Sequence, residues 1–491
     1  MNNLKGLIII FLISVPGLAQ NWVQLGQDII GENSGDNFGD QISLSHDGNR
    51  IAICGFNNGN ARGHLRIYEN QSGNWVQLGQ DIDGTDAGDQ LGISIQINDE
   101  GTRVITSSRF QFTDSSGVIW GDARVFEYQN NIWVPMGDFI TGPPNQSEPF
   151  AFVVSMNASG NIVAASSRAW QGFSGLTRVY EFNNGVWTQL GNDIVGNPGE
   201  VTGAGISLNA TGNRIAVGGP GNDEGGLENR GIVRIFELAG GTWVQLGQGI
   251  TGEAAFDEIG EPFDLNDVGD RIIIGEPDND DVAPNSGKAR VFELQSGSWI
   301  QLGSTFRGTQ QADALGWEVS INSEGNRMSF IKILDNLSNN HVGVVAVYEY
   351  ANGDWQQLFQ ELEGVEIGDG YGVNISLSGG GQHIATNAPA IGPGVAYVYV
   401  NDQILSSGNE NDALKFLVYP NPNNGNFVID LKAAYQNLTM NIYSFEGKLI
   451  STTEHNRVRR LSISQPLPSG IYFVQCISND NINETIKIII E

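Results

Sequence analysis

One tryptophan phrase recurs along this chain at nearly constant spacing, and this repeat limits the fold more than any other feature. The stretch Asn21–Ile29, NWVQLGQDI, returns letter for letter at Asn74–Ile82, and looser copies follow. The tryptophans of the seven copies lie 53 to 58 residues apart: Trp22, Trp75, Trp133, Trp187, Trp243, Trp299 and Trp355. A period of this size is typical of arrays in which each repeat forms one small structural unit.

Between two tryptophans the same order of short segments repeats, and each segment has the pattern of a β-strand. In the first copy Gln41–Ser45 alternates large and small side chains, a turn follows, and Ile51–Gly55 and His64–Asn70 continue the pattern. Four strands of about five residues in a unit of about 54 residues are what a propeller blade contains. We therefore predict an all-β chain whose main domain, residues 20–400, is a seven-bladed β-propeller.

The order of the segments also predicts how the ring closes. The last set of inner strands, within Tyr371–Val400, has no tryptophan strand after it, whereas the strand at Trp22–Leu25 has no inner strands before it. We expect the N-terminal strand to complete the seventh blade, because this pairing removes free sheet edges. A residue that recurs once per blade is best explained as scaffold, so we interpret the tryptophans as packing residues rather than as a sugar platform.

The first residues and the composition indicate where the protein works. Residues 1–19 contain a lysine, an apolar stretch and small residues before Gln20, which is the order of a secretory signal peptide. No other apolar run reaches the roughly 18–20 residues of a membrane-spanning helix. The formal net charge of −30 disfavours nucleic acid and anionic lipid as partners. We expect an exported, soluble monomer, with Cys54 as a buried free thiol.

Two further phrases recur around the inner strands. Some second strands end in Gly/Asn-x-Pro, as at Pro220, and an Asp-x-x-Gly motif precedes five inner strands, beginning at Asp36, Asp89, Asp257, Asp313 and Asp369. The pattern resembles the FG-GAP repeat, the blade of the integrin α-chain propeller and of many bacterial surface proteins. Integrin blades often carry a calcium loop, but the turns here hold too few acidic residues for one. We therefore expect no cofactor; calcium stays open as an alternative, but these turns do not imply it. The aspartates are expected to cap turns.

The composition changes from Leu414 onward, after a polar linker at residues 401–413. The phrases Val418–Leu431, Asn441–Ile450 and Leu467–Cys476 resemble the C-terminal sorting domain of type IX secretion, found in Bacteroidetes-like bacteria. The matching residues are Pro420, Asn421, Pro422, Gly425, Gly447, Gly470 and Lys487. Several short strands within residues 414–491 suit a small β-sandwich. The resemblance implies that the type IX secretion machinery reads this domain as an address to the cell surface or the surroundings.

Candidate ligand-binding residues lie in loops of variable length, where a rigid scaffold presents binding groups. Two loops of adjacent blades supply an aromatic and arginine patch, formed by Phe110, Phe112, Trp120, Arg168, Trp170 and Phe173. Such a patch suits a glycan or a peptide, unless these side chains only pack the loops onto the rim. Asp278, Asp280 and Asp281 offer oxygen ligands for a metal ion, and the alternative is a solvated acidic loop.

Catalytic motifs are not evident in the sequence. The five histidines are scattered without metal-ligand spacing or a nucleophile partner. We therefore expect a non-catalytic binding module, similar to an adhesin or lectin, for an extracellular glycan or protein. The alternatives are an extracellular enzyme that acts on polysaccharide or protein through carboxylates at the channel mouth, and a structural surface component.

Overall fold

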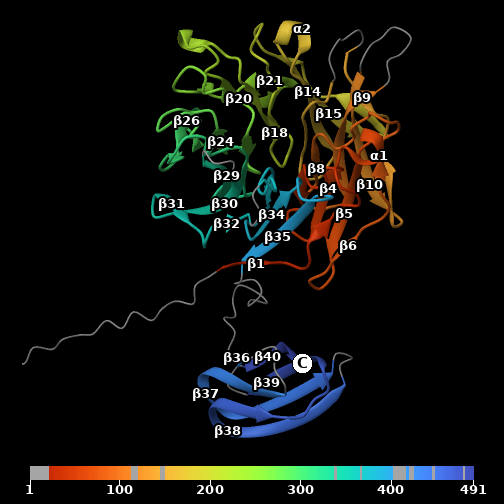
Figure 1. Cartoon of the computed structure of the whole chain (residues 1–491), viewed down its shortest axis with the longest axis vertical. Coiled ribbons are helices and arrows are strands. Elements are labelled where there is room, and N and C mark those ends of the chain that lie inside the picture. The colour runs from red at the N-terminus through yellow and green to blue at the C-terminus, as the bar shows by residue number, and fades with distance from the viewer. Residues whose placement is uncertain are drawn as a thin grey trace, which may run out of the picture. The chain divides into compact units, whose positions relative to one another are not determined.

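Strands dominate the computed structural model, which describes residues 21–111, 120–143, 150–336, 340–364, 368–401, 416–419, 425–444, 448–478 and 482–490. The chain divides into two units, Met1–Asn401 and Asp402–Glu491 (Figure 1). Some of the predictions lie outside the described residues, namely the signal peptide at residues 1–19, Phe112, Pro420, Asn421, Pro422 and Gly447.

Seven sheets of five strands form the first unit, and they follow one another along the chain. Each has four strands in order and a short fifth strand that pairs with the third. The first three complete sheets consist of β3 (Ile42–Leu44), β4 (Arg50–Gly55), β5 (His64–Asn70), β6 (Trp75–Gln77) and β7 (Ile82–Asp83); β8 (Ile95–Ile97), β9 (Arg103–Gln111), β10 (Trp120–Gln129), β11 (Ile132–Pro135) and β12 (Ile140–Thr141); and β13 (Val154–Met156), β14 (Ile162–Ser167), β15 (Leu176–Asn183), β16 (Val186–Gln189) and β17 (Ile194–Val195).

The next three sheets repeat this arrangement. They consist of β18 (Ile206–Leu208), β19 (Arg214–Gly219), β20 (Ile232–Ala239), β21 (Thr242–Gln245) and β22 (Ile250–Thr251); β23 (Phe263–Leu265), β24 (Arg271–Glu276), β25 (Lys288–Gln295), β26 (Ser298–Gln301) and β27 (Phe306–Arg307); and β28 (Val319–Ile321), β29 (Arg327–Asn336), β30 (Asn340–Ala351), β31 (Asp354–Gln357) and β32 (Leu362–Glu363).

The remaining sheet joins the two ends of the unit. It contains β33 (Ile375–Leu377), β34 (His383–Ala388) and β35 (Val395–Asn401), together with β1 (Trp22–Gln24) and β2 (Ile29–Ile30). Trp22 pairs with Asn401 and Ile29 with Ala396, both in antiparallel register. The N-terminal strands therefore stand where the fourth and fifth strands stand in the other sheets.

A glycine accounts for the short fifth strand, which the sequence pattern did not predict. Gly79 follows the tryptophan strand with a φ of +79°, a left-handed conformation, and ends it. A Cβ at this residue would lie 2.9 Å from Cδ1 of Trp133 in the next sheet. The chain therefore kinks at each such glycine, and the residues after it return to the third strand as a separate short strand.

Two belts of hydrogen bonds join the inner strands. In the first belt, the side chain at the centre of each inner strand accepts a hydrogen bond from a backbone N–H of the next sheet, over 2.7 to 3.2 Å; the acceptors are Ser43, Gln96, Ser155, Ser207, Asp264, Ser320 and Ser376. In the second, backbone groups of adjacent turns bond over 2.9 to 3.3 Å, through His46, Asp99, Ala158, Ala210, Asp267, Ser323 and Gly379. Both belts pass through all seven sheets and return to the first.

The tryptophans join the sheets farther out. Six of them donate the indole N–H to a backbone carbonyl of the preceding tryptophan phrase, as Trp299 does to Leu246 over 2.9 Å. The buried Nε1 atom of Trp22 has no such partner among the described residues. The tryptophans are therefore scaffold residues, and Trp22 alone lacks the polar contact.

Helical segments in the described residues are single turns. They are α1 (Asn58–Ala61), α2 (Trp170–Phe173) and the 3-10 turn Glu224–Gly226, all in loops between the second and third strands of a sheet. None of the helices in the described part of the chain has the length or apolar character to cross a membrane.

The second unit contains one five-stranded sheet. Its strands are β36 (Phe416–Tyr419), β37 (Asn426–Ser444), β38 (Leu449–Ser464), β39 (Gly470–Ser478) and β40 (Ile482–Ile490). The long strand β37 pairs with β36, β38 and β39, and its inward side chains pack on those of β39 in a core that includes Ile442 and the buried Cys476. The two-sheet sandwich stays a prediction, because the described strands belong to one hydrogen-bonded sheet.

Candidate functional site

The predicted aromatic patch is only partly visible in the described residues. Phe110 and Trp120 belong to β9 and β10, whose ends pair through Gln111 and Trp120, and the structure describes the backbone alone at both aromatic residues. The other three side chains lie on the loop between β14 and β15. That the β9–β10 and β14–β15 loops form one surface therefore stays a prediction.

The three described side chains of the patch have different surroundings. Trp170 packs against the hydrophobic core of its sheet. The Arg168 guanidinium lies over the ring of Phe152, 3.8 Å from its centroid, and 3.9 Å from the carboxylate of Glu261. Phe173 is 55% exposed. Trp170 therefore anchors the loop onto the rim, and Phe173 is the aromatic side chain that this loop presents to solvent.

The backbone of Phe173 contacts a connection that lines a groove. The connection between β17 and β18 runs along its loop, where the backbone N–H of Val201 donates to the Phe173 carbonyl over 2.7 Å. A cavity of about 460 Å³ opens next to this connection; Asn197, Pro198, Glu200, Gly221, Asn222, Asp223, Glu224 and Arg234 line it. A second cavity of about 210 Å³ shares Asn197, Glu200 and Arg234 with the first and adds Ile194, Val217 and Phe236. We call the two together the loop-face groove.

An ion pair forms the floor of the loop-face groove. Glu200 is 2% exposed and contacts Arg234 of β20. Asn197 and Asn222 donate side-chain hydrogen bonds to the same carboxylate over 2.9 and 3.4 Å. Burial acts to raise the pKa of Glu200, but the hydrogen bond and the charge of Arg234 outweigh it and hold the pKa below its usual range. The groove therefore keeps a fixed charge pair surrounded by amide groups, an arrangement that orients polar ligands rather than transfers protons.

The Asp-x-x-Gly aspartates cap turns, as the sequence predicts. Asp257 accepts backbone hydrogen bonds from Glu253 and Ala254 over 2.7 and 2.8 Å, and Asp89 and Asp313 act in the same way. Asp257 is only 2% exposed. Glu200 occupies the corresponding place in its own repeat and caps Asn197 over 3.3 Å. The groove thus reuses a scaffold position with a longer side chain.

A second polar site lies on the axis of the propeller. A cavity of about 140 Å³ is lined by both hydrogen-bond belts, including Asp264, Ser320, His46 and Asp99. Asp264 is the one acidic member of the side-chain belt; burial raises its pKa to about 6, although Ile321 N–H, Ser207 and Ser320 donate hydrogen bonds to it. We call this space the axial cavity.

Glu318 stands two residues before Ser320, on the same side of β28. Burial first, and then the charges of Asp264 and Glu261, raise its pKa to about 8. Carboxyl groups with raised pKa values are common among proton donors and acceptors of active sites. Asp264 and Glu318 are thus the described residues with the clearest catalytic potential near the axis.

The turn end of the axial cavity carries a small cluster of ligand atoms. His46, Asp99 and Asp267 each place one such atom within 4.8 Å of the others. His46 Nδ1 is also 3.2 Å from the Ser323 hydroxyl. The three side chains stand in the turns between first and second strands, which were predicted to hold too few acidic residues for a calcium loop.

The acidic loop at Asp278, Asp280 and Asp281 does not form a cluster of three close ligand atoms; among the described residues such clusters lie elsewhere. Asp281 is 3.4 Å from Lys288 Nζ and 3.5 Å from Arg307 Nε. Asp280 accepts a hydrogen bond from the Asn285 backbone N–H over 2.7 Å. Asp278 accepts a hydrogen bond from the Asn285 side-chain amide over 3.4 Å. All three carboxylates therefore have protein partners, and a metal ion at this loop stays a prediction.

The strand pairings and the two belts define the class of the main unit, a β-propeller. The C-terminal unit gives the more particular result: residues 417–491 match the secretion system C-terminal sorting domain. This domain directs the chain through the type IX secretion system, so the protein is exported to the cell surface or the surroundings. Its Gly425 has a φ of +90°, and a Cβ there would lie 2.4 Å from the Gln465 carbonyl oxygen, so glycine is required.

Solved structures with a similar fold include three proteins of different activity. They are the periplasmic gluconolactonase of Pseudomonas aeruginosa (14% identity, TM-score 0.45, over 67% of this chain and 86% of that chain), an oligogalacturonate lyase in complex with manganese (10%, 0.46, 78% and 97%) and the β-propeller domain of the trilobed protease from Pyrococcus furiosus (11%, 0.32, 68% and 93%). No curated protein matches the sequence. At these identities the likeness concerns the fold alone, and nothing about chemistry follows from it.

Proposed function

We propose that the protein is an exported binding module that recognises an extracellular glycan through the loop-face groove, without catalysis. The observation that carries this proposal is the groove itself: a space of about 460 Å³ lined by Asn197, Asn222, Glu224 and the Glu200–Arg234 pair. The connection that lines it is hydrogen-bonded to the backbone of the exposed Phe173. Amide and carboxylate groups bond to sugar hydroxyls, and an aromatic ring packs on the apolar face of a sugar.

Two features favour binding over turnover at this groove. Arg234 holds Glu200 ionised, because its charge and hydrogen bond lower the pKa of the carboxyl, so Glu200 is a poor proton donor at neutral pH. The two loops that line the groove are also tied to each other by a backbone hydrogen bond, from Gly221 N–H to the Glu200 carbonyl over 3.2 Å. A preformed polar groove suits recognition at low entropic cost.

A glycan-binding array with the secreted full-length chain tests this proposal. We expect selective binding that falls at least tenfold in Phe173→Ala and in Glu224→Ala. Phe256 provides a matched control, because it is a phenylalanine of similar exposure (52%) in the loop between β22 and β23. Phe256→Ala should bind as the wild type does. Equal binding by Phe173→Ala and the wild type would show that the ligand does not bind at the loop-face groove. An array without any binding would show that the ligand is not one of the glycans tested.

A second candidate function is hydrolysis or elimination on an extracellular polymer at the axial cavity. The raised pKa values of Asp264, about 6, and Glu318, about 8, favour it, since such groups exchange protons near neutral pH. Polymer-degradation assays with the wild type and Glu318→Gln distinguish the two functions. Turnover that Glu318→Gln abolishes would support the enzyme, whereas binding that Phe173→Ala weakens would support the binding module.

We further propose that the ring is a closed seven-bladed propeller of the FG-GAP type, completed by the N-terminal strand after removal of a signal peptide. The pairing of β1 and β2 with β35 supports this closure, as do the two belts. For the sorting unit we propose a sandwich made by folding its single sheet on itself, which its one hydrophobic core supports.

A further inference from the structure

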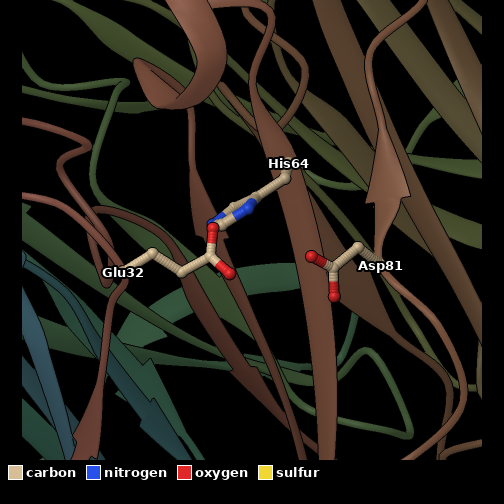
Figure 2. Close-up of side chains that lie close together, drawn as sticks. All are labelled: Glu32, His64 and Asp81. Atoms are coloured by element: carbon tan, nitrogen blue, oxygen red, sulfur yellow. The ribbon is translucent and has the colours of Figure 1, made fainter.

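A second cluster of ligand atoms lies away from both sites described above. Glu32, His64 and Asp81 each place one ligand atom within 4.8 Å of the others. Figure 2 shows the two carboxylates turned toward each other, with the imidazole of His64 beside them. Glu32 follows β2, His64 begins β5, and Asp81 directly precedes β7. The cluster therefore joins the N-terminal segment to the sheet that follows it.

His64 is the unusual member of the cluster. Its side chain is 0% exposed, and neither ring nitrogen has a hydrogen-bond partner. Its ring instead meets the edge of Phe38, with 5.9 Å between the ring centres. A buried imidazole without polar partners is unfavourable unless something else contacts its nitrogens.

The other sheets show what this position normally holds. At the corresponding place in the third strand stand Asp122, Leu176, Ile232, Lys288, Val344 and Val395. The two charged residues of this set are fully paired: Asp122 contacts Arg124 over 2.8 Å, and Lys288 contacts Glu253 over 2.8 Å and Glu276 over 3.2 Å. Within the repeat the position is thus either apolar or satisfied by protein groups. His64 alone is polar without a protein partner.

We propose that Glu32, His64 and Asp81 bind a divalent transition-metal ion of the Zn²⁺ type. One imidazole nitrogen and two carboxylate oxygens are a ligand set that zinc accepts. Ligand atoms of a tetrahedral zinc ion lie roughly 3.4 Å apart, so the three side chains need only small movements to close around an ion. Calcium is disfavoured, because it prefers six or more oxygen ligands and avoids imidazole.

Arg66 and Asn58 complete the surroundings of the cluster. Arg66 contacts Glu32, and its Nη2 lies 2.6 Å from Asp81 Oδ2. Asn58 donates to the second oxygen of Glu32 over 3.4 Å. Carboxylate oxygens accept more than one partner, and groups that hydrogen-bond to metal ligands orient them. With two carboxylates and one guanidinium, the cluster carries one net negative charge before the ion binds, which favours a cation.

The ion would act as a staple between sheets. Glu32 belongs to the segment that contains β2, which pairs with β35 at the end of the propeller, whereas His64 and Asp81 belong to the sheet of β3 to β7. A metal ion that binds the folded state alone stabilises it in proportion to the logarithm of its concentration. We therefore expect zinc to raise the melting temperature of the propeller.

Zinc titration of the chelator-treated, full-length chain tests the proposal, by calorimetry and by the thermal shift with ZnCl₂. His64→Leu is the main variant; leucine stands at the same repeat position at residue 176, so the variant is expected to fold. His46→Ala is the control, because His46 belongs to the other described cluster, with Asp99 and Asp267.

We expect zinc affinity to fall at least tenfold in His64→Leu and in Glu32→Gln, and the thermal shift to shrink with it, while His46→Ala retains both. CaCl₂ at the same concentration should neither compete nor shift the melting temperature. If His64→Leu binds zinc with wild-type affinity and shift, or if the wild type gives no shift that depends on His64, the proposal is wrong. Should His64→Leu fail to fold, Glu32→Gln decides the question, since the Glu32 side chain is 48% exposed and its replacement should not disturb the core.

Discussion

Replacing Glu318 by glutamine should stabilise the propeller, and only above acidic pH. The pKa of this carboxyl is raised from an ordinary 4.5 to about 8 by burial and by the charges of Asp264 and Glu261. A carboxyl whose pKa is higher in the folded state binds protons more tightly there, so its ionisation opposes folding. The folded state keeps its full stability below pH 4.5, where Glu318 is protonated in both states, and loses stability as the pH rises toward 8.

The size of the effect follows from the same shift. At about 1.4 kcal/mol for each tenfold change in proton affinity, ionised Glu318 destabilises the folded state by up to about 5 kcal/mol above pH 8. Because the side chain is partly exposed, solvent screening reduces this, and we expect about 2–5 kcal/mol. Unfolding about 380 residues has an entropy of about 0.8 kcal/mol per kelvin, so the melting temperature should rise by about 3–6 °C.

Thermal unfolding at a series of pH values from 4 to 9 measures this effect. Glutamine occupies the corresponding place in the first complete sheet, at Gln41, so the variant introduces a residue that the fold already accepts. Glu363→Gln removes an equal charge from an exposed residue of β32 and should change little at any pH. A shift for Glu318→Gln that is the same at pH 4.5 and 8.5, or a fall at pH 8.5, would refute the reasoning.

Three further predictions concern the scaffold. Deleting Asn21–Ile30 should lower the melting temperature of the whole propeller, because it removes both strands that pair with the outer edge of β35; an unchanged temperature in calorimetry would contradict the closure. Trp299→Phe should reduce the free energy of unfolding by about 1–2 kcal/mol more than Trp22→Phe, as measured with urea, because only the Trp299 indole donates a hydrogen bond. Cys54 and Cys476 are both buried, and burial raises the pKa of the Cys54 thiol, so a thiol reagent should react with neither in the native protein and with both in denaturant; reaction of native Cys54 would show that the sheet opens.

Much of the scaffold follows from the sequence because each structural demand is repeated seven times. The tryptophan phrase predicted the number of sheets, since each copy must bury the same side chain. The alternation in Gln41–Ser45 predicted the inner strand, where Ile42 and Leu44 pack between sheets and Ser43 joins the belt. The short fifth strand was missed because it depends on a left-handed residue after each tryptophan strand, a glycine in six repeats and Phe359 in the seventh. The letter pattern alone does not distinguish this kink from a turn.

The candidate sites were harder to predict because their residues meet across sheets. Glu200 and Arg234 are 34 positions apart, and Glu32 and His64 are 32 apart, so only the fold brings each pair together. A signal was nevertheless present. At the positions of Asp264 and Glu318 the other repeats hold neutral residues. At the position of His64 they hold apolar residues or charged residues with their own partners, so all three residues are exceptions within the repeat. Comparing the repeats with one another, position by position, would have identified all three.

The loop prediction was limited for a different reason. Trp170 and Phe173 are neighbours on one turn, yet Trp170 enters the core and Phe173 faces solvent. The difference arises from the backbone of the turn, in which Phe173 itself has a φ of +61°. Side-chain chemistry gives no indication of such a conformation. The sequence could therefore identify both aromatic residues as candidates, but it could not predict that Trp170 packs on the core while Phe173 is exposed.

The pairing of Trp22 with Asn401 has a consequence for how this chain reaches its native state. The two residues are about 380 positions apart, so the contact has nearly the largest sequence separation that the propeller allows, and contacts of this kind form late and slowly. No earlier segment can substitute for β35, and synthesis of the propeller must be complete before its first strand finds a partner. The propeller therefore remains open while it is being synthesised, and β35, its last strand to emerge from the ribosome, is the one that pairs with the first.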